Sequence, residues 1–428
     1  MKTNVEDISS IKKKLNIEIP EDQVTKEVDS LYREVGKKAK IKGFRPGKVP
    51  RNILERHFKD YVKAEAIQKL IQDTYPVILS ETNLQPVSPP VIDPGDLEIG
   101  KTFQYSATIE IKPEMKMEGY LGLNIEGKKE SVKDEEVEER LRGLQNLHAH
   151  LKTVSEARPI QNGDYVIFDY EARMDHKPLE EGKAIDFTVE VGSGRFIPAL
   201  EERLIGLKTE EEKEIEISFP EDYGYAKWAG KTISFHVKIK EIKEKILPLL
   251  DDEFAKDLGD YSSLEELKAK LKGEIEREKE QALERELKDQ LVDQLLRANS
   301  FEVPESLVEE QTKALVSNTK LRLTSQGIDL KNLNVSEEKL KEDYREVALK
   351  QVRTFLILEK ISAQEGITVT DGEADDRLRE ISEGMHQKFD MVKRYYEKND
   401  LIPEVKAGIL RDKTLNFLLQ KANISTCR

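Results

Sequence analysis

The chain has 428 residues, a net charge of −14 at pH 7, and 36% charged against 6% aromatic residues. This balance argues against a protein that coats nucleic acid, and it is typical of long solvated helices rather than of a compact, aromatic-rich enzyme. At roughly 150 residues per domain the length predicts about three domains. The N-terminus has no signal-peptide pattern and no run is long enough to span a membrane, while the single cysteine, Cys427, can form no internal disulfide. These features predict a cytoplasmic protein.

Residues 1–112 predict an α+β domain. Apolar and polar residues alternate over 15–19, as in a half-buried strand. A helix is expected from Glu21, with apolar residues three and four apart, and it should stop at the Gly- and Pro-rich segment 43–50.

The same domain continues with a second helix, of which Pro50 is expected to be the first residue. A later helix runs through Ala66 and Leu70, and Pro76 is expected to kink or end it. Clean alternation over 103–111 predicts a returning strand.

Residues 113–150 predict a helical bridge that starts near Ser131 and Asp134 and has one apolar face reaching to Leu151. Residues 151–245 then change to a period of two. This predicts an antiparallel β domain with four strands, at 165–170, 187–191, 215–219 and 233–239.

Residues 246–428 return to a helical period. Helices are expected to open at Ser263, Pro304, Ser336 and Thr370. Ser263 and Thr370 are each followed three residues later by a glutamate, as in a capping box, and Ser336 begins an apolar stripe. Because the apolar stripes are narrow, they favour an elongated all-α domain with thin helical arms. Complete burial of every stripe between neighbouring helices is the alternative.

A basic loop, defined here as residues 33–59, stands out in the acidic chain. It carries ten basic residues and two acidic ones, so its net charge is +8. Phe44 sits among these charges, and an exposed aromatic flanked by cations is typical of an interface anchor on an anionic partner. The alternative is a plain helix connection whose Phe44 folds into its own core.

No cofactor, nucleotide or metal is expected. Gly43 and Gly47-Lys48 resemble a phosphate-binding loop only superficially, because the spacing is one residue short and Val49 replaces the required Ser or Thr. His148 and His150 alone are too few ligands for zinc.

The segment IKGFRPGKVP closely resembles the ribosome-docking signature of the trigger factor family, and length and domain order match over essentially the whole chain. This resemblance implies docking on ribosomal protein and RNA beside the exit tunnel. Cations would contact phosphates and the aromatic would fix the register. The residues that carry the resemblance are Gly43, Phe44, Arg45, Pro46, Gly47 and Lys48.

The β domain resembles the FK506-binding (FKBP) class of peptidyl-prolyl isomerases. The resemblance lies in the strand pattern, in the segment GSGRFIPAL at 192–200, and in the late tyrosine turn at 222–225. The pocket residues that it implies are Tyr170, Phe187, Phe196, Ile197, Tyr225 and Phe235.

Such a pocket needs neither nucleophile nor acid–base pair. An apolar site disfavours the charge-separated amide resonance, while a donor such as Tyr225 holds the carbonyl oxygen before proline. Two positions depart from the family, since Leu200 stands where Trp or Phe is usual and Glu180 where many members have Asp. A packed β core that binds peptide without catalysis is the alternative.

The resemblance further implies that residues 113–150 pack with 246–428 and that the arms hold nascent and unfolded polypeptides without ATP. The segment 302–311 also resembles the helical domain of the trigger factor family. No membrane partner is expected, and a homodimer away from the ribosome is compatible with the resemblance. Two other hypotheses remain, a stand-alone prolyl isomerase and a non-catalytic helical assembly scaffold.

Overall fold

The computed structural model describes residues 1–42, 44, 47–155, 158–174, 177–225, 227–328 and 336–426, without the side chains of 180, 181 and 426. Contacts divide the chain into two units, Met1–Lys128 together with Leu283–Arg428, and Lys129–Ala282. Cys427 and three residues of the segment 43–48, namely Gly43, Arg45 and Pro46, lie outside the described residues.

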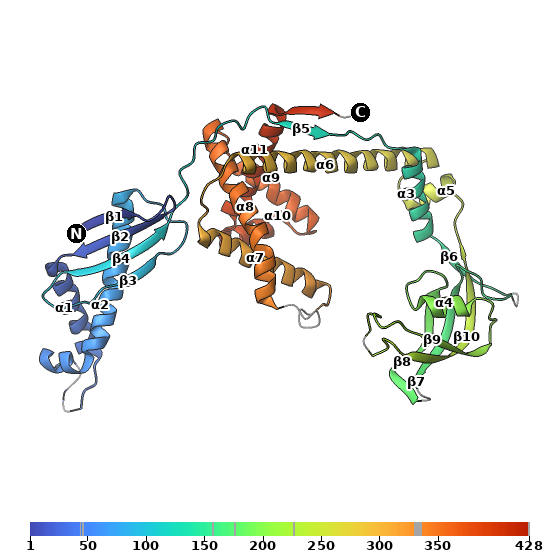
Figure 1. The fold of residues 1–428 in the computed structure, drawn as a ribbon, viewed down its shortest axis with the longest axis horizontal. Coiled ribbons are helices and arrows are strands. Elements are labelled where there is room, and N and C mark those ends of the chain that lie inside the picture. Colours follow the sequence, from blue (N-terminus) through green and yellow to red (C-terminus); the bar gives the residue numbers. More distant parts are fainter. Residues whose placement is uncertain are drawn as a thin grey trace. The chain divides into compact units, whose positions relative to one another are not determined.

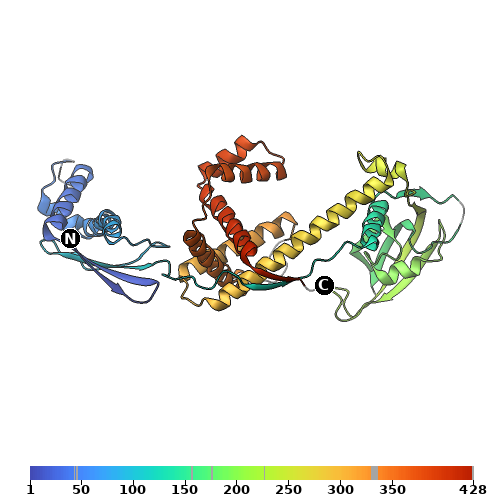
Figure 2. The same cartoon turned by 90° about the horizontal axis from the view of Figure 1, so that it is seen from above.

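The N-terminal region is a four-stranded antiparallel sheet in the order β1-β2-β4-β3 (Figure 1). Helices α1 and α2 lie on one face of this sheet (Figure 2). The bounds are β1 Lys2–Asp7, β2 Lys12–Ile19, α1 Glu21–Lys38, α2 Arg51–Thr82, β3 Val91–Pro94 and β4 Phe103–Glu110. The predicted strands at 15–19 and 103–111 are therefore confirmed.

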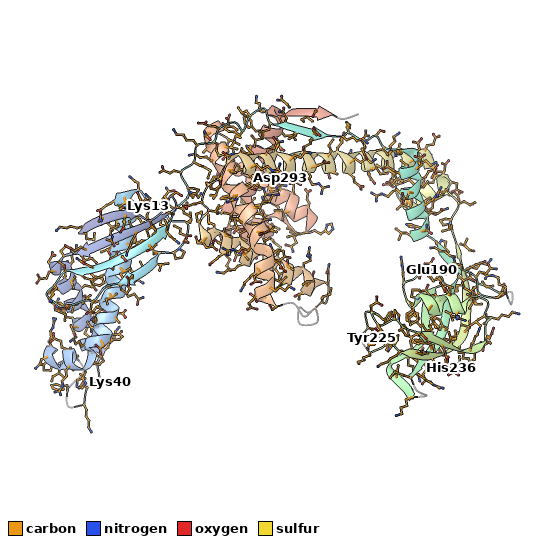
Figure 3. All side chains as sticks on the ribbon, viewed as in Figure 1. Lys13, Lys40, Glu190, Tyr225, His236 and Asp293 are labelled. Carbon is orange, nitrogen blue, oxygen red and sulfur yellow. The ribbon has the colours of Figure 1, made fainter. Side chains whose placement is uncertain are left out.

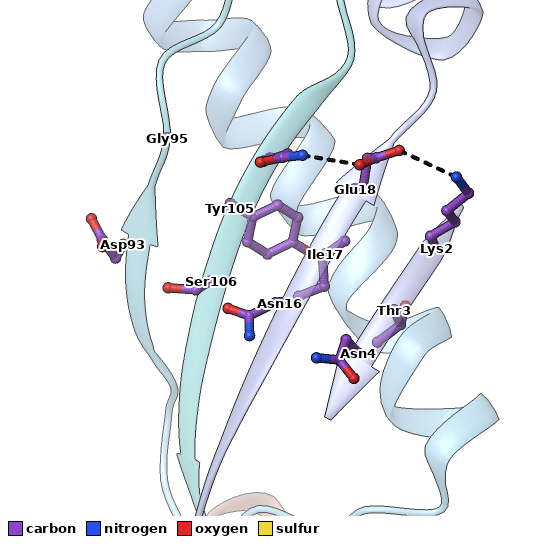
Figure 4. Close-up of a pocket in the computed structure, with 11 residues that line it drawn as sticks. Lys2, Thr3, Asn4, Asn16, Ile17, Glu18, Asp93, Gly95, Tyr105 and Ser106 are labelled. Atoms are coloured by element: carbon purple, nitrogen blue, oxygen red, sulfur yellow. Dashed lines mark hydrogen bonds and ion pairs between the residues drawn. The ribbon is translucent and has the colours of Figure 1, made fainter. Parts of the chain in front are cut away.

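The alternation seen in the sequence separates the two faces of this sheet. Leu15, Ile17 and Ile19 are buried against apolar residues of α1 and α2. The opposite face is polar and holds a cavity of about 480 Å³, where Asn4, Asn16, Ser106 and Asp93 lie side by side across the four strands (Figure 4).

Helix α2 differs from expectation in two places. Pro50 precedes it as the N-cap residue rather than occupying its first position, and the helix continues through Pro76 to Thr82. The backbone is instead non-helical at Phe58, with φ −127° and ψ 15°. Pro76 is tolerated because it is exposed, and the carbonyl that loses its helical donor belongs to Gln72, which is also exposed.

The β domain is a five-stranded antiparallel sheet in the order β6-β10-β7-β8, with β9 on β10. Its bounds are β6 His150–Thr153, β7 Tyr165–Met174, β8 Lys177–Glu190, α4 Pro198–Leu204, β9 Glu212–Ser218 and β10 Thr232–Ile246. The four expected strands are confirmed within β7, β8, β9 and β10. Strand β6 was not predicted, and Leu151 belongs to it rather than to the preceding helix.

Helices α3, Asp134–Leu147, and α5, Asp252–Leu258, form a small core with the first half of α6, Leu264–Ala298. Val137 and Leu141 pack there with Phe254, Leu267 and Leu271. Helix α3 begins at Asp134, within the predicted start near Ser131 and Asp134, but its N-cap is Lys133 rather than Ser131, and the Lys133 N–H donates to the Glu136 carboxylate at 2.9 Å. A lysine can stand there because the third residue of the helix supplies the acceptor.

The helices that follow α6 are α7 Glu305–Ser325, α8 Glu337–Glu365, α9 Asp371–Gly384, α10 Phe389–Lys398 and α11 Ile402–Lys421. Of these, α8 and α11 form a second apolar core with the second half of α6 and the segment 115–125. The expected caps are present, since Ser336 Oγ accepts from Lys339 N–H at 3.2 Å and Thr370 Oγ1 from Glu373 N–H at 3.3 Å. Strand β5, Asn124–Gly127, pairs in parallel with β11, Asn423–Thr426. The predicted fold class, an α+β N-terminal domain, a β domain and a helical C-terminal domain, is confirmed.

Candidate functional site

A cluster of aromatic rings occupies one side of the β domain. Phe187 contacts both Phe196 and Tyr170, with ring centroids 4.6 and 5.5 Å away. Tyr170 also contacts Phe196 at 5.3 Å and Phe235 at 6.3 Å. Residues from β7, β8, β10 and the segment before α4 therefore meet in one place, which we call the aromatic pocket.

The aromatic pocket has a buried floor and a more open rim. Ile197, Leu200 and Phe235 are fully buried in the domain core. Tyr170, Phe187 and Phe196 are only half-buried, so part of each ring remains accessible. This arrangement offers a partly accessible apolar surface made of aromatic rings.

The Tyr170 hydroxyl keeps its proton over the physiological range. Burial raises the pKa of this group above its ordinary value, because the phenolate would be poorly solvated. No hydrogen-bond partner for the hydroxyl is present among the residues that the structure describes. Its O–H is therefore available as a hydrogen-bond donor.

Tyr225 lies apart from the other five residues that the resemblance implied. It is 39% exposed, on the loop between β9 and β10 (Figure 3). Its ring meets Trp228 edge-on at 5.4 Å, and Trp228 in turn lies 5.8 Å from Phe235. Trp228 thus connects this loop to the pocket floor.

Two rings of the cluster were not identified from the sequence. Phe168 contacts Tyr170 and Phe187, each at 5.8 Å. Phe219 contacts Tyr223 at 4.6 Å and Trp228 at 5.4 Å. In the expected strands, Phe168 and Phe219 stand on the same face as the other apolar residues. This alternation is the one sequence signal that could have identified them.

The two departures from the FK506-binding pattern have different outcomes. Leu200 is completely buried and replaces the usual large ring by a smaller apolar floor. The Glu180 side chain lies outside what the structure describes.

An ion pair anchors the segment that leads into the β domain. Arg158 donates from Nη1 to Asp164 Oδ2 at 2.6 Å and from Nη2 to Oδ1 at 2.8 Å. The Gln161 N–H adds a third bond to Oδ2 at 2.8 Å. These bonds lower the pKa of the buried Asp164 carboxyl, with the Arg158 contact as the main cause.

The basic loop in the N-terminal region presents its charges to solvent. All nine described basic residues of 33–59 are exposed, and of these nine only Arg51 forms an ion pair with a described residue, to Asp29 and Glu55. Lys40 lies at the loop end of the two helices (Figure 3). Phe44 is 38% exposed.

Other residues of the loop are held by backbone contacts. Phe44 N–H donates to Ile41 carbonyl at 3.0 Å, and Gly47 N–H donates to Gly36 carbonyl at 3.2 Å. Gly47 has φ +82°, a conformation that favours glycine. Lys48 is exposed, whereas Gly43, Arg45 and Pro46 of the predicted docking set lie outside the described residues.

In the described part of the chain, no helix is long and apolar enough to cross a membrane. No cluster of three or more potential metal-binding side chains occurs among the described residues.

Sequence comparison matches family models along most of the chain. Residues 1–144 match the bacterial trigger factor protein, residues 156–240 the FKBP-type peptidyl-prolyl cis-trans isomerase, and residues 263–420 the C-terminus of bacterial trigger factor. Trigger factor of Geotalea daltonii is 40% identical over 426 residues, covering 99% of this chain and 98% of that protein. Trigger factor of Geobacter sulfurreducens is 37% identical, with 99% of each chain covered.

A solved structure of a trigger factor chaperone, studied for promiscuous substrate recognition in folding and assembly, has a similar fold. Its TM-score is 0.54 at 22% identity, covering 98% of this chain and 100% of that chain. Together with the two relatives and the aromatic pocket in the β domain, these matches establish that the chain belongs to the trigger factor family of chaperones and carries an FKBP-type peptidyl-prolyl cis-trans isomerase domain.

Proposed function

We propose that this chain docks beside the ribosomal exit tunnel in the cytoplasm through its basic loop, holds nascent and unfolded polypeptides without ATP, and isomerises X-Pro bonds in the aromatic pocket. The domain limits that we propose are 1–112 for docking, 151–245 for isomerisation, and 246–428 with the bridge 113–150 for holding. The observation that carries the docking proposal is the exposed basic loop, whose nine described cations, apart from Arg51, have no ion pair with a described residue.

The charge pattern of the loop suits an RNA-rich surface. Cations that are already paired within the protein would have to lose those partners before contacting phosphate. Among the described cations of the loop only Arg51 is so paired. Phosphates release counterions when they meet such cations, and the half-exposed ring of Phe44 supplies a fixed apolar contact on a ribosomal protein.

The aromatic pocket supports isomerisation by exclusion of water. Rotation about the peptide bond meets a barrier of ~18–20 kcal/mol because of amide resonance. Half-buried Tyr170, Phe187 and Phe196 around a floor of Phe235 and Leu200 provide an apolar site for the proline ring. We propose that Tyr170 or Tyr225 donates to the carbonyl before proline, so that the twisted state binds more tightly than the planar one.

Exposed apolar side chains on the helical domain support the holding role. They lie on α7, α8 and α10. The largest are Leu321, Val347, Phe355, Met391 and Tyr395, each at least 40% exposed. Exposed apolar groups of this kind bind unfolded chains with little sequence preference.

The docking proposal is tested by co-sedimentation with ribosomes. We expect Phe44→Ala to weaken ribosome binding about tenfold or more, because the ring is the apolar anchor of the contact. Tyr61→Ala is the matched control, since Tyr61 is an exposed aromatic of α2 beyond the loop. Unchanged binding of Phe44→Ala would refute docking through this loop.

Holding and isomerisation are separated by a variant of the pocket in the full-length chain. We expect Phe196→Ala to slow proline-limited refolding while suppression of aggregation is retained. Parallel loss of both activities would favour the stand-alone isomerase. Saturable binding to a single folded protein, without preference for unfolded chains, would favour the assembly scaffold.

A further inference from the structure

Glu201 carries a buried carboxylate next to the aromatic pocket. It lies in α4 and is only 1% exposed. No ion pair to Glu201 occurs within the described part of the chain. A buried carboxylate is strongly unfavourable unless hydrogen bonds replace its water, so its partners must account for its presence.

Those partners are backbone N–H groups of the segment that precedes α4. Oε2 accepts from Gly194 N–H at 2.8 Å, and Oε1 accepts from Phe196 N–H at 3.0 Å. The Ser193 hydroxyl lies 3.5 Å from Oε2 and itself accepts from Arg195 N–H at 3.3 Å. Two N–H groups of one short segment that both donate to a single carboxylate restrain the backbone that carries them.

This backbone presents Phe196 to the aromatic pocket. The Phe196 ring lies 4.6 Å from Phe187 and 5.3 Å from Tyr170. The beginning of the segment is held by other contacts, because Gly192 packs so closely on Asn162 that a Cβ would come within 1.7 Å of its side chain, and Ser193 N–H donates to the Glu190 carbonyl at 3.1 Å. The remaining freedom of the segment, between Gly192 and α4, is therefore restrained by Glu201.

We propose that Glu201 is a positioning residue for prolyl isomerisation, which holds residues 193–196 so that Phe196 forms one wall of the aromatic pocket. The inference rests on the proposed assignment of the isomerase site to this pocket. Its basis is the set of contacts from one carboxylate to the N–H groups on both sides of Arg195.

Both carboxylate oxygens are needed in this role. Glutamine has nearly the same shape, but its amide has one oxygen acceptor and one NH₂ donor. In Glu201→Gln either Gly194 N–H or Phe196 N–H would face a donor and lose its bond. The substitution therefore loosens the segment while it leaves the volume of the core almost unchanged.

The test is the kinetics of isomerisation of a short proline peptide by the full-length chain. For Glu201→Gln we expect kcat/KM to fall about tenfold, mainly through a higher KM, because the pocket wall is no longer preformed. Glu202→Gln is the matched control, since Glu202 is the exposed neighbour with the same charge, and its kinetics should equal those of wild type. Phe196→Ala is measured in parallel.

The outcomes distinguish the role of Glu201 from the assignment of the isomerase site to the aromatic pocket. If Phe196→Ala lowers kcat/KM and folded Glu201→Gln does not, the role of Glu201 is refuted and the pocket assignment stands. If Phe196→Ala has wild-type kinetics, the pocket assignment itself is refuted. A loss carried by kcat alone, with KM unchanged, would also contradict a role in forming the binding wall.

A second measurement on the wild-type chain does not depend on folding of a variant. Amide protons bound to a carboxylate resonate downfield and exchange slowly with water. In NMR spectra of the wild-type protein we expect the Gly194 and Phe196 amide protons to resonate downfield and to exchange slowly with water. Fast exchange of these two amides, at the rate of an exposed loop, would overturn the inference.

Discussion

The basic loop and the aromatic pocket use their side chains in opposite ways. In the loop, the described cations apart from Arg51 face solvent without acidic partners, and Phe44 is partly exposed. In the pocket, the rings contact one another above a completely buried floor that includes Phe235. A surface that must find a large charged partner keeps its charges available, whereas a site that must exclude water is assembled from packed neighbours. The two sites should therefore respond differently to core mutations and to salt.

The largest effect is expected at the pocket floor. Phe235→Ala removes a fully buried ring and should lower the free energy of unfolding of the β domain by about 3–5 kcal/mol. Trp228 is the single tryptophan and lies 5.8 Å from Phe235, so its fluorescence in urea reports this transition. Ribosome binding should be unchanged. A loss of stability below about 1 kcal/mol would contradict a packed floor.

A smaller loss is expected at the Arg158–Asp164 ion pair. Asp164→Asn should lower the free energy of unfolding of the β domain by about 2–3 kcal/mol at neutral pH, because it removes a charged acceptor of three hydrogen bonds. The pKa of Asp164 is lowered in the folded state, so its contribution is complete above the ordinary pKa and is lost as pH falls through the folded value. Wild type and variant should converge in acid. A difference in the free energy of unfolding between wild type and variant that grows as pH falls would contradict this role of Asp164.

In the loop we expect a change of affinity with little change of stability. Lys40→Ala/Lys42→Ala removes two exposed cations, and ribosome affinity should fall about tenfold with a shallower dependence on salt. The free energy of unfolding should change by less than about 0.5 kcal/mol. The matched control, Lys183→Ala/Lys213→Ala, removes two exposed lysines of the β domain. An equal loss of affinity in the control would show that net charge, and not the loop, governs binding.

The smallest effect concerns Glu373 at the start of α9, which is half-buried and, unlike most cations of the basic loop, has charged and hydrogen-bonded partners. Lys413 and the Thr370 N–H and hydroxyl lower the pKa of its carboxyl to about 2. Because the folded pKa is depressed, the helix cap is complete above about pH 4.5 and is lost as pH falls through about 2. NMR titration of the carboxyl carbon measures this directly. A midpoint near the ordinary value of about 4.3 would show that these contacts are absent in solution.

Much of the fold follows from local patterns in the sequence. Alternation identifies β2, β4 and the central strands of the β domain, and cap residues such as Ser336 and Thr370 mark the starts of helices. The pairing of β5 with β11 could not be predicted, because it joins segments near residues 125 and 425 and no local pattern specifies such a pairing. The predicted kink or helix end at Pro76 was wrong, because the effect of a proline depends on its exposure, which the sequence does not specify.

The site residues divide in the same way. Five of the six pocket residues implied by the FK506-binding resemblance lie together in the β domain core, whereas Tyr225 contacts Trp228, which in turn contacts Phe235. Phe168 and Phe219 join the rings because of how β7, β9 and β10 are paired, which alternation alone does not tell. In the sequence Glu201 resembles a surface acid. Only the folded chain shows that it is buried and bound to the segment 193–196.

The central claim is that docking and isomerisation are carried by separate sites of opposite character. It is tested most directly by measuring ribosome affinity and kcat/KM for a proline peptide on the same preparations of Phe44→Ala and Phe196→Ala. We expect Phe44→Ala to lose ribosome affinity and keep its kcat/KM, and Phe196→Ala to do the reverse. If Phe44→Ala retains full ribosome affinity, or if either variant loses both activities while folded, the claim is contradicted.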